Sequence, residues 1–97
     1  QGQVVICRDG EVLRIGGALT LTTVPDVCPQ VALQIEQGAH VLDFSDVTEV
    51  DSSAVALALE WQRIAARSGI SLRLENLPAS MLNLSKLYGV SELVQPN

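Results

Sequence analysis

The chain opens with two short apolar segments separated by a turn sequence. Residues 4–6 and 12–15 flank Arg8-Asp9-Gly10, and an Asp-Gly pair accepts the positive φ that a tight hairpin turn needs. The pattern predicts two antiparallel strands. Gly16-Gly17 is then expected to break the strand pattern.

A helical period follows the predicted hairpin. It is carried by four apolar residues: Val24, Cys28, Val31 and Ile35. Thr22 or Thr23 can cap this helix, and Gly38 is expected to end it. Because a proline inside a helix removes a backbone hydrogen bond, we expect the regular helix to begin only near Pro29.

The middle of the chain predicts a buried strand followed by a long helix. Residues 40–44 form an apolar run suited to a central strand, and residues 45–51 form an acidic loop. Ser52-Ser53 then starts a helix that is expected to run to about Arg67. Apolar and polar residues alternate over residues 70–74, which predicts another strand.

The last part of the chain completes a ββαβαβα order. Pro78 is placed to start a final helix with Gly89 as its cap, and residues 93–94 suit a short strand or coil. Two strand-helix-strand crossovers add parallel strands to the hairpin. We therefore expect a single α/β domain over residues 1–97, with a mixed sheet of four to five strands and three to four helices mainly on one face.

Composition narrows the classes of function. The net charge is -5, and the six Lys and Arg residues are scattered, so nucleic-acid binding is not expected. The longest apolar stretch, residues 54–59, is far too short to cross a bilayer. Cys7 and Cys28 are expected to be buried, reduced thiols, which favours the cytoplasm. His40 is the single histidine, and no catalytic, nucleotide-binding or metal-binding motif is recognisable, so we expect neither an enzyme nor a cofactor.

One segment resembles a known family. Residues 41–57, VLDFSDVTEVDSSAVAL, are similar to the central motif of STAS domains, the family of bacterial anti-sigma-factor antagonists. The motif is an apolar strand ending in Asp43, then a short loop to Asp51-Ser52-Ser53 at a helix start. The resemblance continues in residues 13–19 and 84–93. It implies the STAS fold and a regulatory role through protein binding.

Two subfamilies differ in the partner that the resemblance implies. Residues 84–94, LSKLYGVSELV, are most similar to the STAS subunit of the Mla phospholipid-transport system, which binds an ABC ATPase beneath the inner membrane. The alternative is an antagonist that binds an anti-sigma serine kinase and is switched by phosphorylation of Ser52. Phosphorylated antagonists usually carry Gly where this chain has Ala54, and many STAS domains carry Leu-Asp where it has Leu19-Thr20. The first departure favours the transport subfamily, and the second, a missing carboxylate beside the serine, weakens the case for a phosphorylation switch.

The start of the helix at Ser52 is the candidate binding surface. Ser52 is either a capping serine or an exposed hydroxyl that a partner contacts or a kinase phosphorylates. Residues 54–59 are apolar all around the helix, which fits either burial or a dry contact centre for a protein partner. Trp61 is expected in the core. The predicted partner-binding residues are Thr48, Asp51, Ser52, Ser53, Val55, Ala56 and Leu59.

Overall fold

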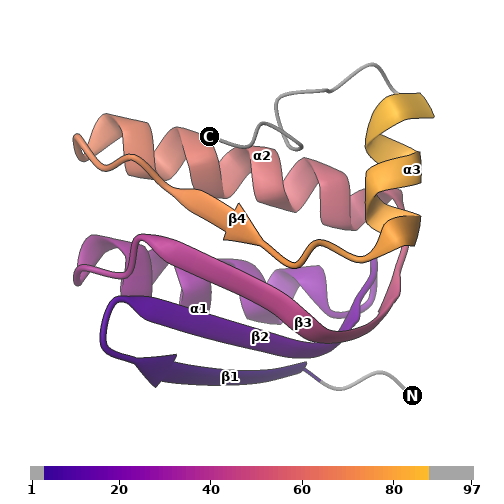
Figure 1. Cartoon of the computed structure of the whole chain (residues 1–97), viewed down its shortest axis with the longest axis horizontal. Coiled ribbons are helices and arrows are strands. Elements are labelled where there is room, and N and C mark those ends of the chain that lie inside the picture. The colour runs from indigo at the N-terminus through magenta and orange to yellow at the C-terminus, as the bar shows by residue number, and fades with distance from the viewer. Residues whose placement is uncertain (1–3, 88–97) are drawn as a thin grey trace.

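A four-stranded mixed sheet in the order β1-β2-β3-β4 forms the centre of the computed structural model, which describes residues 4–87 (Figure 1). The elements are β1 (Val4–Asp9), β2 (Val12–Leu19), α1 (Val24–Glu36), β3 (Val41–Val50), α2 (Ser52–Arg67), β4 (Arg73–Glu75) and α3 (Ala79–Leu87). β1 pairs antiparallel with β2, whereas β2–β3 and β3–β4 are parallel pairs. The predicted α/β fold, with an opening hairpin and a mixed sheet, is confirmed.

The hydrophobic core lies between one face of the sheet and the helices α1 and α2. Trp61 of α2 is 0% exposed, as predicted, and its indole Nε1–H donates to the Cys28 carbonyl of α1 at 3.3 Å. The indole thereby fills the core and satisfies its polar group, as a buried Trp must. Further fully buried side chains come from the central strands and from α1: Leu13, Ile15, Leu42, Phe44, Val27, Val31 and Ile35.

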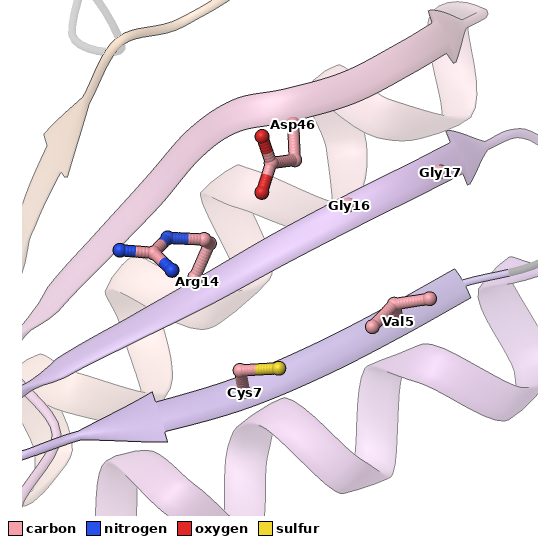
Figure 2. Close-up of a pocket in the computed structure, with 6 residues that line it drawn as sticks. All are labelled: Val5, Cys7, Arg14, Gly16, Gly17 and Asp46. Atoms are coloured by element: carbon pink, nitrogen blue, oxygen red, sulfur yellow. The ribbon is translucent and has the colours of Figure 1, made fainter.

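The opposite face of the sheet is not covered by the described helices. Val5, Cys7 and Arg14 are exposed there and line a shallow hollow of about 260 Å³ (Figure 2). Cys7 is therefore not a buried thiol, and the prediction for it was wrong because its side chain faces the uncovered side of the sheet, whereas its neighbour Ile6 packs against the core. Cys28 is half-buried, and burial together with the charge of Glu60 raises the pKa of its thiol, despite an opposing hydrogen bond from Trp61.

Helix α1 and strand β2 are both longer than the sequence predicted. α1 begins at Val24, with Pro25 in its first turn and Pro29 inside it. Core packing of its apolar side compensates for the hydrogen bond that Pro29 removes, so the prediction of a later start was wrong. Gly16-Gly17 does not break β2, which continues through both glycines to Leu19.

The other boundaries also differ from the expected ones. β3 extends to Val50, so most of the expected acidic loop is strand, while β4 is limited to Arg73–Glu75. α2 ends at Arg67 as predicted, and α3 begins directly after Pro78. The expected cap Gly89 and the terminal strand or coil at 93–94 lie outside the described residues.

β2 and β3 approach each other closely where their register shifts. Arg14 pairs with Asp43 but Gly16 pairs with Asp46, so β3 carries one extra residue between these pairs. A Cβ atom on Gly16 would lie 2.9 Å from the Asp46 Cβ and 3.3 Å from its carbonyl oxygen. Only glycine allows this approach without a shift of the backbone.

Replacing Gly16 by alanine is expected to lower the free energy of unfolding by about 1–3 kcal/mol, because the new methyl group overlaps Asp46. Urea denaturation measures the change. The loss should be smaller when Asp46 is already replaced by glycine, since that removes the nearest atom. An unchanged urea midpoint in Gly16→Ala would contradict the close approach.

Candidate functional site

The candidate site lies where the parallel strands β2 and β3 end at the same edge of the sheet. β2 leads into the loop of residues 20–23 before α1, and β3 leads through Asp51 into α2. The Asp51 N–H donates to the Leu19 carbonyl at 3.3 Å, which joins the two strand ends. Carboxyl-end loops of parallel strands are a common position for binding sites in α/β folds.

Asp51 connects the two segments through its side chain. One carboxylate oxygen, Oδ1, accepts from the Ser53 N–H at 2.8 Å and caps α2. The other, Oδ2, accepts from the Leu21 N–H at 3.0 Å. The capping interpretation of Ser52 was therefore wrong: Asp51 is the N-cap, and Ser52 is the first helical residue, with its side chain exposed.

The loop of residues 20–23 is fixed from its other side by Thr23. The Thr23 hydroxyl donates to the Ala18 carbonyl at 2.8 Å and accepts from the Thr20 N–H at 3.0 Å. Thr23 is the N-cap residue of α1, as predicted, but its side chain supports the loop and makes no hydrogen bond to the helix N–H groups. Within this fixed loop the Leu21 side chain is 74% exposed.

Leu21 is the residue of the site that sequence reasoning missed. A lone apolar residue between threonines carries no periodic pattern, and its contact with Asp51 spans thirty positions. The sequence did offer one indication, because Leu21 stands in the run of threonines before α1, between two predicted elements. Apolar residues in such loops are unusual because turns favour polar residues and glycine.

The predicted partner-binding residues divide into an exposed and a buried group. Thr48, Ser52 and Ala56 are exposed, and Asp51, Ser53 and Leu59 are partly exposed. Val55 is only 3% exposed and packs in the core, so its side chain supports the helix from inside. We call the exposed area formed by Leu21, Thr22, Ser52 and Ala56 the loop–helix surface.

The charged side chains at this edge of the sheet are acidic. Asp46, Thr48 and Glu49 are exposed on the last part of β3, and Asp51 follows the end of this strand at Val50. The free N–H groups of the first turn of α2 would favour an anion at Ser52. Asp51 already occupies one of these groups, however, and the carboxylates nearby repel further negative charge. A cationic partner therefore fits this edge better than an anionic one.

Asp43, the strand residue of the STAS-like motif, forms a separate polar cluster on the open face. Its Oδ1 accepts hydrogen bonds from the Ser45 N–H at 2.9 Å and from the Asn76 side-chain amide at 3.0 Å. The Arg14 Nε lies 3.9 Å from the Asp43 Oδ2. Burial raises the pKa of Asp43, but these hydrogen bonds and the charge of Arg14 outweigh it, so the pKa lies below its ordinary value. The cluster links β2, β3 and the residue after β4, so Asp43 serves to hold these parts of the sheet together.

The open-face hollow shows no comparable set of interactions. Cys7 and Val5 of β1 lie across from Arg14, Gly16 and Asp46 (Figure 2). Among residues 4–87, no three His, Cys, Asp or Glu side chains are grouped so as to hold a metal ion.

No helix in the described part of the chain has the length and apolar character needed to cross a membrane.

Comparisons with known proteins agree with this fold. A family model described as Mlab, STAS domain, matches residues 4–95. The anti-sigma factor antagonist SpoIIAA in its unphosphorylated form is similar, with a TM-score of 0.67 and 21% identity, covering 96% of this chain and 84% of that chain. The Bacillus cell fate determinant SpoIIAA in the phosphorylated form has a TM-score of 0.62 and 22% identity, covering 96% and 87%. No curated protein sequence matches the chain. At these identities the solved structures show the fold alone.

Replacing Asp51 by alanine is expected to lower the free energy of unfolding by about 1–2 kcal/mol, because α2 loses its cap and the Leu21 N–H loses its acceptor. The matched control is Ser52→Ala, which should change stability by less than about 0.5 kcal/mol because the Ser52 side chain is exposed. Urea denaturation of both variants provides the measurement. Equal losses in the two variants would restore Ser52 as the cap.

The stability contributed by Asp43 should depend on pH. Because the pKa of Asp43 in the folded state lies below its ordinary value of 3.8, this contribution is complete at neutral pH and is lost as pH falls through the folded-state pKa. Asp43→Asn should therefore be less stable than the parent near pH 7, and the two stabilities should converge below pH 3.8. Urea denaturation across this range measures the difference, and a difference independent of pH would contradict the assignment.

Proposed function

The chain belongs to the STAS domain family, and from this membership we propose that it is a non-catalytic subunit of an Mla-type phospholipid-transport ABC complex. It binds the ATPase of that complex at the cytoplasmic side of the inner membrane and thereby supports the maintenance of outer-membrane lipid asymmetry. The observation that carries the proposal is the loop–helix surface, where an exposed leucine, a hydroxyl and a small apolar residue lie on a fixed backbone.

The geometry favours binding over catalysis. A nucleophilic serine needs a general base within hydrogen-bond reach. His40 precedes β3 and Ser52 follows it, so the ten residues of this strand separate them by about 30 Å. His40 instead lies 3.1 Å from Glu11. Asp51 is adjacent to Ser52, but its two carboxylate oxygens accept from backbone N–H groups.

The second candidate function is that of an anti-sigma-factor antagonist that binds a serine kinase. Ser52 is exposed at the start of α2, so a kinase active site could reach it. A phosphate would add about -1.5 to -2 charges beside Glu49 and Asp51 and could expel the chain from a partner by repulsion. The description of the matching family model and Ala54 in place of the usual glycine favour the transport function.

Purification of the tagged chain from its native cells is expected to recover an ABC ATPase and its permease in stoichiometric amounts, identified by mass spectrometry. Recovery of an anti-sigma serine kinase would reverse the ranking of the two functions. Ser52→Asp separates them again with purified proteins. The substitution should abolish binding to such a kinase, whereas an ATPase partner should tolerate it better because no phosphorylation switch is involved.

The same purification tests the surface when Ala56 is replaced by arginine. Ala56 is exposed on α2, and a long charged side chain there would separate the two proteins or bury an unpaired charge. We expect the ATPase to be lost. The matched control is Ala66→Arg, on an exposed position near the other end of the same helix, which should retain it. Equal recovery with Ala56→Arg would exclude this surface.

A further inference from the structure

Resting on the proposed function, we propose that Leu21 is the main apolar anchor of the loop–helix surface, and that the ATPase receives it in an apolar pocket rimmed by basic side chains. The site assignments made from sequence place the contact on α2 and the end of β3. The structure adds the loop between β2 and α1 as an equal part of the surface.

The side chain of Leu21 is exposed on a backbone that is already fixed. Its N–H donates to Asp51 Oδ2 at 3.0 Å, and Thr23 holds the loop on the other side through Ala18 and Thr20. A side chain on a fixed backbone loses less conformational entropy when it enters a pocket. Burying the leucine side chain away from water favours binding in proportion to the apolar area removed from solvent.

Leu21 differs from the other exposed apolar residues in its position, which matters because single exposed residues are common on protein surfaces. Leu33 is 51% exposed on α1, Val5 is 57% exposed on β1, and Leu87 is 75% exposed at the end of α3. Leu33 lies nine residues after the start of α1, about 14 Å along the helix axis from the β2–α1 loop. Only Leu21, among these four, is hydrogen-bonded to the N-cap of α2, beside Ser52.

The distribution of charge along the chain indicates the chemistry of the partner. Residues 15–62 contain no Lys or Arg, yet they contain seven Asp and Glu residues. This segment includes the whole loop–helix surface. All six basic residues lie outside it: Arg8, Arg14, Arg63, Arg67, Arg73 and Lys86. In the fold, the acidic residues placed beside this surface are the exposed Glu49 at the end of β3 and Asp51, the N-cap of α2. An apolar centre beside these carboxylates is complementary to an apolar pocket with a basic rim.

The test measures the affinity of the full chain for the purified ATPase subunit by calorimetry. Leu21→Ala should weaken binding at least tenfold, as expected for an interface anchor. Leu33→Ala is the matched control and should bind within about twofold of the parent. Both leucines are exposed, so both variants should keep the parent urea midpoint. Affinity of the parent should also fall as NaCl is raised from about 50 to 500 mM.

The possible outcomes distinguish this inference from the proposed function. If Leu21→Ala binds like the parent while Ala56→Arg does not bind, the anchor is excluded and docking on the ATPase stands. If both variants bind like the parent, the loop–helix surface is excluded as well. If the affinity is independent of salt, the basic rim is excluded. An equal loss with Leu33→Ala would contradict the assignment of Leu21 as the particular anchor.

Discussion

The parallel pairing of β2 with β3 is the constraint on which the rest of the structure depends. Because both strands run in the same direction, the segments that follow them leave the same edge of the sheet. Gly16 makes the pairing sterically acceptable at Asp46, where any side chain would collide with β3. The crossover between the strands places α1 on the same face that α2 covers, and Trp61 fills the space between sheet and helices.

Asp51 converts this arrangement of strands into a defined surface. Its two carboxylate oxygens bind one N–H of α2 and one N–H of the β2–α1 loop, so the loop and the helix are held together. Leu21, Ser52 and Ala56 are thereby displayed on one support. A surface that is already ordered binds a partner with little further loss of entropy. This property suits a subunit that acts through stable docking.

The sequence predicted the elements better than it predicted their limits. The Asp-Gly turn and the burial of Trp61 depend on short segments and were correct. The continuation of β2 through Gly16 depends on the neighbouring strand, which local glycine preferences do not reveal. Leu21 was missed for the same reason, since only its distant hydrogen bond to Asp51 joins it to α2. The family was recognised from the particular residues of the β3–α2 motif, because neither hydrophobic periodicity nor composition identifies it.

In the proposed complex the partner covers the loop–helix surface and leaves the open face of the sheet free. Hydrogen–deuterium exchange of the chain, alone and bound to a purified ATPase of the proposed Mla type, distinguishes these two faces. Exchange is expected to slow on binding in residues 20–23 and 51–56 and to stay unchanged in β1. Slower exchange in β1 and unchanged exchange in those two segments would place the partner on the open face and exclude the loop–helix surface.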